Sequence, residues 1–152
     1  MLFQGQEFME NGSFTHWREL DWERVETYDG IVQLYRDLIR LRRNQAGKTA
    51  GLTGGWFETI YLDEKEKLFA YRRWDKGGPG DDVVVLFNFA NTAREAVQLK
   101  FPAPGDWQVR FNSDWKGYSE DFTEVPADPV WVEHDVAGVA VGPYSVIILS
   151  QD

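Results

Sequence analysis

The sequence predicts a mainly β protein, in which an antiparallel β-sandwich follows a single strand–loop–helix unit. Three patterns support this fold class. Apolar and polar residues alternate in short runs from Trp56 onward, as they do in strands with one buried face. Apolar residues recur at helical spacing between Ile31 and Leu41, and the chain opens on a continuous apolar run, Met1 to Phe3. We expect two domains, residues 1–47 and residues 48–152.

The opening run predicts a strand that is covered on both faces, with polar Gln6 and Glu7 following it. A signal peptide would need a basic start and a longer apolar stretch, and Gln4 and Glu7 interrupt this one too early. The other alternative is a vector-derived remnant, because residues 2–5 resemble part of a protease site used in expression vectors. We favour a strand that belongs to the protein.

A polar stretch, residues 10–29, then predicts a loop with one helical turn near residues 22–25. The helix that follows has Asp29 placed to cap its start, and it should end near Asn44, before Gly47. The apolar stripe on one face predicts that this helix packs against the rest of the protein. The stripe consists of Ile31, Leu34, Tyr35, Leu38, Ile39 and Leu41.

The second part of the chain predicts many short strands joined by turns. "TIYLDEKEKLFAYRRW" alternates around a polar turn at residues 63–67, and "VVVLFNFA" follows the glycine-rich loop "DKGGPGDD". Strands with no helix between them are typical of an antiparallel sandwich. Further strands are expected at residues 96–101, 107–112, 129–133, 138–141 and 144–149.

Composition excludes several classes of function. The 25 acidic and 16 basic residues give a net charge of −9, which disfavours binding to nucleic acid or to an anionic membrane. Four arginines cluster at positions 36, 40, 42 and 43, where the end of the helix favours cations. There is no cysteine and there are two histidines, so we expect no disulfide, no metal site and no cofactor. The longest apolar run, residues 83–87, is too short to span a membrane.

Aromatic residues make up 15% of the chain, including seven tryptophans. Such a density predicts either a sheet core or platforms that stack on sugar rings. Trp115 and Tyr118 are the best candidates for sugar contact, because "SDWKGYSEDF" is polar and contains glycine. A packing role for either residue remains the alternative.

Three stretches of the first part resemble a known enzyme family. "LFQGQEF", "LDW" and "GIVQLYRDLIRLRR" are similar to the last strand, loop and helix of the (β/α)₈ catalytic barrel in the α-amylase superfamily, glycoside hydrolase family 13. They most resemble bacterial 1,4-α-glucan branching enzymes. "VVVLFNFAN", "WQVRFNSDWKGY" and "VGPYSVIIL" resemble the C-terminal all-β domain of the same enzymes. The resemblance implies a sandwich of that type after one unit of a truncated barrel.

The resemblance also implies that this chain has no catalytic residue. The family uses a retaining mechanism with two carboxyl groups about 5 Å apart, and they belong to barrel strands that come before the part seen here. Glu7 matches the family's Gly-x-Glu position, where it would support the substrate cleft from behind in an intact parent. Adjacent carboxylates elsewhere should be solvated turn residues. The two pairs in predicted turns are Asp63 with Glu64 and Asp81 with Asp82, and the third adjacent pair, Glu7 with Glu10, contains the Glu7 just described.

The leading hypothesis is therefore a cytoplasmic, non-catalytic C-terminal fragment of a branching-enzyme-like protein, either a natural truncated product or a cut piece. The parent would cleave an α-1,4 linkage and re-form it as α-1,6. The alternative is a stand-alone module that binds α-glucan, such as glycogen or a malto-oligosaccharide, or that serves structure and assembly. An uncovered strand at residues 1–3 would favour a homo-oligomer.

Overall fold

The computed structural model describes residues 3–13 and 15–152. Met1 and Leu2 lie outside the described residues, so most of the expected opening strand does as well. For Phe3 the strand prediction is wrong, because this residue lies in irregular backbone that leads into a 3₁₀ helix, η1 (Gln6–Phe8). Gly5 takes a left-handed backbone conformation, φ 85°, which turns the chain, and Phe8 is the residue that is buried.

The predicted helix is confirmed as α2 (Asp29–Arg42), preceded by the short α1 (Arg24–Thr27). Asp29 does not cap it: Tyr28 holds the N-cap position, and no side chain bonds the first turn. The carboxylate of Asp29 lies inside that turn, where it meets the positive end of the helix dipole. Asn44, with φ 50°, and Gly47, with φ 72°, then turn the chain away from the helix axis.

Eight strands follow, and each predicted strand is confirmed to within two or three residues at its ends. Short η2 (Ala50–Leu52) precedes them. They are β1 (Trp56–Asp63), β2 (Leu68–Trp74), β3 (Val83–Asn88), β4 (Arg94–Lys100), β5 (Gly105–Asn112), β6 (Val130–Val132), β7 (Val136–Val141) and β8 (Ser145–Ser150). In the described part of the chain they form one sheet in the order β1-β2-β3-β8-β5-β6 and a second of β4 and β7, with every pair antiparallel.

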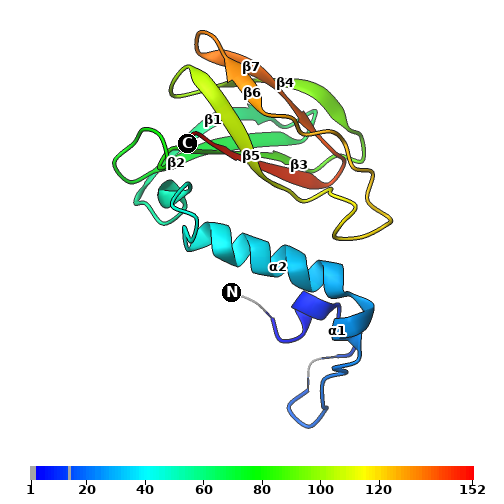
Figure 1. Cartoon of the computed structure of the whole chain (residues 1–152). Helices are drawn as coiled ribbons and strands as arrows, with labels where there is room; N and C mark the ends of the chain where they lie inside the picture. Colours follow the sequence, from blue (N-terminus) through cyan, green and yellow to red (C-terminus); the bar gives the residue numbers. More distant parts are fainter. Residues whose placement is uncertain (1–2, 14) are drawn as a thin grey trace.

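The main core lies between the two sheets (Figure 1). Leu86 and Ile147 face it from the large sheet, and Leu99 and Val139 face it from the small one. Trp107 on β5 is fully buried there, and its indole N–H donates to the carbonyl oxygen of Ala103 at 3.0 Å. This arrangement is the antiparallel sandwich that the alternation predicts.

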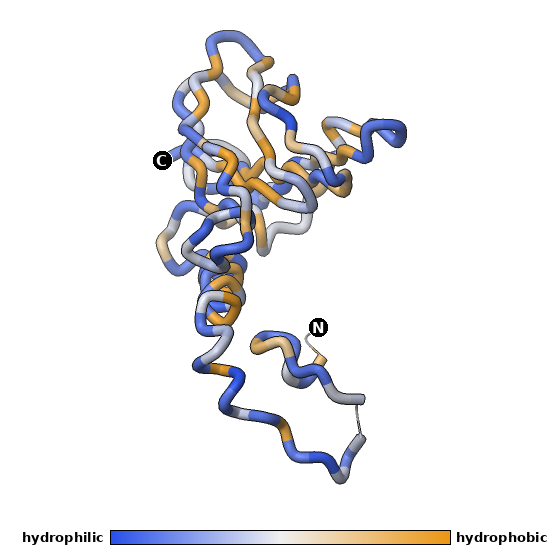
Figure 2. The backbone as a smooth tube through the Cα atoms, turned by 90° about the vertical axis from the view of Figure 1, so that its right-hand side faces the viewer, coloured by the Kyte–Doolittle hydropathy of each residue, from blue (hydrophilic) through white to orange (hydrophobic). Residues whose placement is uncertain are grey.

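A second core covers the other face of the large sheet. Val83 and Val85 of β3 and Phe111 of β5 are buried against α2, which contributes Leu34, Leu38 and Leu41. β3 is therefore covered on both faces, which explains its unbroken apolar run. Figure 1 shows α2 along the sandwich with η1 on its other side, and Figure 2 shows that the segment before α2 extends away from the sandwich.

Asp81 and Asp82 are buried, so the expectation of solvated turn carboxylates is wrong for this pair. Asp81 accepts hydrogen bonds from the backbone N–H groups of residues 75–77. Asp82 accepts a hydrogen bond from the N–H of Gly78 and forms an ion pair with Arg72 at 2.7 Å. Burial alone would raise the pKa of Asp81, but the three N–H donors outweigh burial and hold it below the usual range. The two carboxylates thus fix the glycine-rich loop between β2 and β3.

No helix within the described residues is long and apolar enough to cross a lipid bilayer.

Candidate functional site

Trp115 and Tyr118, the two predicted contact residues, line one groove of about 370 Å³. β5 forms one wall, and the segment 124–127 forms the other. We call this the Trp115 groove. Its remaining lining residues are Val109, Arg110, Phe111, Asn112, Glu124, Val125, Pro126 and Ala127.

The two aromatic residues differ in what they can contact. Trp115 is 48% exposed, whereas Tyr118 is 7% exposed. Their rings meet edge to face, with centroids 5.0 Å apart at 87°. The Trp115 indole lies directly over Gly117, where an added Cβ would stand 2.4 Å from the ring carbons. A glycine at 117 therefore sets where the exposed indole can rest.

Tyr118 fastens the groove to α2. Its hydroxyl donates to Oδ2 of Asp37 at 2.9 Å, and the other oxygen of Asp37 accepts bonds from Gln33 at 2.7 Å and Arg40 at 3.2 Å. Burial raises the pKa of the Tyr118 hydroxyl, and the hydrogen bond and charge of Asp37 raise it further. This geometry favours a packing role for the Tyr118 ring, which leaves Trp115 as the ring that a ligand can reach.

Asp114 and Asn112 hold the second wall of the groove. The buried carboxylate of Asp114 accepts the Thr123 N–H at 3.0 Å, the Thr123 hydroxyl at 2.7 Å and the Val125 N–H at 2.9 Å. The side-chain amide of Asn112 donates to the carbonyl of Val125 at 3.2 Å. Sequence reasoning missed these residues and Asp37. The only local signal was "NSD" just after a strand, where side chains bond nearby backbone.

Glu7 is not brought to the groove. It belongs to η1, which lies on the side of α2 away from the sandwich (Figure 1). Its Oε2 is buried and has no hydrogen-bond partner among the described residues. Nearby Glu10 accepts the N–H groups of Gly12 and Asp21, at 3.2 and 2.9 Å, and so closes the loop before α1. A role for Glu7 behind a substrate cleft stays a prediction.

The described residues contain no group of three or more histidines, cysteines or carboxylates that could hold a metal ion. At the β1–β2 turn, Asp63 accepts the Glu66 N–H at 2.9 Å, a turn role like that of Asp81. The groove instead offers an exposed indole and two charged side chains, Arg110 and Glu124, in its lining. One of these, Arg110, is held in place by its bond to Ser150 at 2.9 Å. Such a surface is suited to binding a ligand with apolar faces and hydroxyl groups.

Comparison with known families and proteins agrees with this fold. Residues 61–152 match the family described as alpha amylase, C-terminal all-beta domain. Two curated relatives are 1,4-alpha-glucan branching enzymes. The one from Rhodopseudomonas palustris is 33% identical over 126 residues, 78% of this chain and 17% of that protein. The one from Rhizobium meliloti is 29% identical over 161 aligned positions, all of this chain and 22% of that protein. The chain thus spans about a fifth of the length of these relatives.

Solved structures of similar fold include a pullulanase from Anoxybacillus, with a TM-score of 0.63, 18% identity, and coverage of 99% of this chain and 20% of that one. The α-amylase from H. orenii aligns with a TM-score of 0.57 and 22% identity over 93% of this chain and 27% of its own. At these identities the likeness concerns the fold.

Proposed function

Because this chain belongs to the α-amylase C-terminal all-β domain family, we propose that it is the non-catalytic C-terminal part of a branching-enzyme-like protein and contacts α-glucan through the Trp115 groove. The similarity to two 1,4-alpha-glucan branching enzymes supports the parent and the substrate class. The observation that carries the proposal is the half-exposed indole of Trp115, which rests over the bare backbone of Gly117 at a groove whose second wall is held by Asp114.

The chemistry of the groove suits a neutral sugar chain. An indole face gains free energy when it covers the apolar face of a sugar ring. Arg110 and Glu124 add charged groups that can donate to and accept from hydroxyl groups. The net charge of −9 weakens the binding of a polyanionic ligand by repulsion, whereas it does not change the affinity for a neutral one.

A second candidate function is assembly. Ile39 of α2 is exposed, and Trp17 and Trp22 of the preceding segment are exposed as well. Apolar surface of this kind is typical of a face that packs on another protein, on the rest of a longer chain or on a second copy. Sedimentation across a wide concentration range tests the second copy, since a monomer at every concentration would exclude it.

The test of glucan contact is calorimetric titration of the full chain with maltoheptaose. We expect saturable binding that Trp115→Ala weakens at least about tenfold and Trp115→Phe weakens less. Trp56→Ala is the matched control, because Trp56 is also exposed but lies on β1, outside the groove. No heat at millimolar ligand, or full binding by Trp115→Ala, would overturn the proposed contact.

The absence of catalysis is tested separately. Incubation of the purified chain with amylose should release no reducing ends and form no branches above the buffer blank. A turnover that survives repurification would contradict the non-catalytic assignment.

A further inference from the structure

A second tryptophan, which sequence reasoning did not single out, is more exposed than Trp115. Trp131 on β6 has 70% of its surface exposed, while its neighbour Val132 is fully buried in the main core. The alternation of the strand therefore fixes the indole on the outer side of the sandwich. An exposed indole adds nothing to the core, and it carries an argument only together with the groove that it lines.

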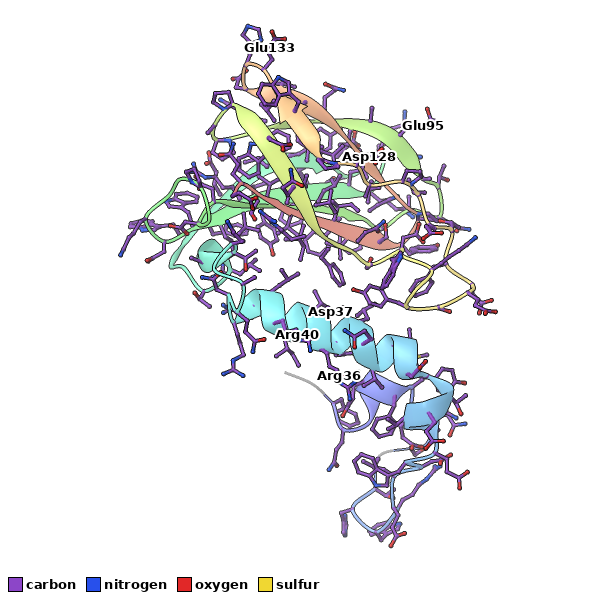
Figure 3. The ribbon with its side chains drawn as sticks, viewed as in Figure 1. Arg36, Asp37, Arg40, Glu95, Asp128 and Glu133 are labelled. Atoms are coloured by element: carbon purple, nitrogen blue, oxygen red, sulfur yellow. The ribbon has the colours of Figure 1, made fainter. Side chains whose placement is uncertain are left out.

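Trp131 lines a groove of about 340 Å³, which we call the Trp131 groove. β7 provides small residues there, Gly138 and Ala140 on its outer side and Ala137, which also packs against the main core. Glu95 of β4 and Asp128 of the segment before β6 reach the same groove from different parts of the chain (Figure 3). The small residues let a ligand approach the backbone closely beside the indole.

One short segment separates the two grooves. Pro126 lines both of them, with the Trp115 groove on one side and the Trp131 groove on the other. Five residues lead from Pro126 to Trp131, a span of at most about 18 Å even if fully extended. The segment 124–131, which we call the ridge, therefore lines both grooves, and the grooves adjoin at Pro126.

We propose that one α-glucan chain binds across this ridge and contacts both grooves, with Trp131 as its second stacking platform. This inference rests on the proposed function and adds to it a second site and a preference for long chains. Glu95 and Asp128 accept hydrogen bonds from sugar hydroxyls, and the Trp131 groove is lined by no lysine or arginine that would favour an anion.

The Trp131 groove lies on a different side of the molecule from the exposed tryptophans of the segment before α2, the surface proposed above for assembly. Trp17 and Trp22 lie in the segment beyond α2, whereas β6 and β7 lie at the far side of the sandwich from α2 (Figure 1). The two carboxylates, Glu95 and Asp128, and the small residues of β7 fit a thin, hydroxyl-rich chain better than an apolar protein surface.

Binding at two points has a measurable signature. Once one groove holds the chain, the second meets it at an effective concentration of about millimolar, provided that the chain can span the ridge. A short oligosaccharide cannot span it and fills the grooves independently. Affinity should therefore rise steeply with chain length, and only while both tryptophans are present.

The experiment is calorimetric titration of the full chain with maltotriose and with maltodecaose. We expect maltodecaose to bind at least about tenfold more tightly than maltotriose. Trp131→Ala should remove that advantage and lower the number of bound maltotriose molecules from two to one. Trp131→Phe should retain most of the tighter binding of maltodecaose, and Trp56→Ala should bind both sugars as the wild type does. Circular dichroism checks that each variant is folded.

The outcomes separate this inference from the proposed function. Wild-type affinity for maltodecaose in Trp131→Ala, together with loss of binding in Trp115→Ala, would overturn the second site alone. No binding of either sugar by the wild type would overturn the proposed function, and the second site with it. Equal loss in Trp56→Ala would show that neither groove is specific.

Discussion

The hydroxyl of Tyr118 donates a 2.9 Å hydrogen bond to Asp37, 81 residues earlier in the chain. This bond joins the loop that bears Trp115 to α2, and through α2 to the second core of the sandwich. The position of the exposed indole thus depends on a contact between the helical part and the β part of the chain.

Removing this hydrogen bond should lower stability without altering the core. We expect Tyr118→Phe to lower the free energy of unfolding in urea by about 1.5–3 kcal/mol, since the acceptor is an ionised carboxylate. A double-mutant cycle with Asp37→Asn should give a coupling energy of comparable size. Strictly additive losses would show that the two side chains do not interact in solution.

The same contact predicts an alkaline effect. Because the folded-state pKa of Tyr118 is raised, its stabilisation is complete below about pH 10, the unfolded value, and is lost as pH rises through the folded-state value. Urea unfolding above about pH 10 should therefore show a steeper loss of stability in the wild type than in Tyr118→Phe. Parallel curves for the two proteins would contradict the raised pKa.

Gly30 should be intolerant of a side chain although it lies inside α2. An added Cβ would stand 2.3 Å from the carbonyl oxygen of Tyr118, which is backbone and cannot swing away. Alanine at an unhindered helix position gains about 1 kcal/mol over glycine, so a loss of stability in Gly30→Ala would reveal the clash. Gly55→Ala is the control, because nothing lies within 4 Å of that site. A more stable Gly30→Ala protein would contradict the close packing.

Asp81 should make the protein sensitive to acid. Its lowered pKa means that the stabilisation is complete above about pH 4 and is lost as pH falls through the folded-state value. We expect the unfolding free energy of Asp81→Asn to change less between about pH 4 and pH 2 than that of the wild type. Asp121→Asn, which alters an exposed carboxylate outside this loop, is the matched control.

Gly117→Ala tests how the Trp115 groove is held. The substitution removes no group that a glucan could contact, yet the new methyl would displace the Trp115 ring. Affinity for maltoheptaose should fall at least about fivefold, a change of about 1 kcal/mol, with a changed near-ultraviolet circular dichroism spectrum. Unchanged affinity would mean that the position of the indole over Gly117 is irrelevant to binding.

Periodicity predicted α2 and all eight strands because burial of one face imposes a repeat on each element. For Phe3, the described residue of the expected opening strand, the prediction was wrong because a run of three apolar residues has no repeat, and Gly5 turns the chain just after it. Asp37, Asp81 and Asp114 were missed for another reason. Each carboxylate is bonded by partners that the fold supplies, and Asp81 and Asp114 are buried as well, yet in the sequence each looks like any solvated acid.

The candidate site shows the same division. The polar context of Trp115 predicted exposure correctly, but nothing in that context separated it from Tyr118, which α2 covers. Trp131 alternates with apolar neighbours just as a core residue does, so its exposure depends on which side of β6 is left open by β5 and β7.

The most direct test of glucan contact uses the indole N–H signals of the seven tryptophans in a ¹⁵N correlation spectrum during titration with maltodecaose. We predict shifts for Trp115 and Trp131. Buried Trp107, whose N–H donates to Ala103, and exposed Trp56 should stay in place. Shifts confined to Trp17 and Trp22, or no shift at millimolar sugar, would contradict the account.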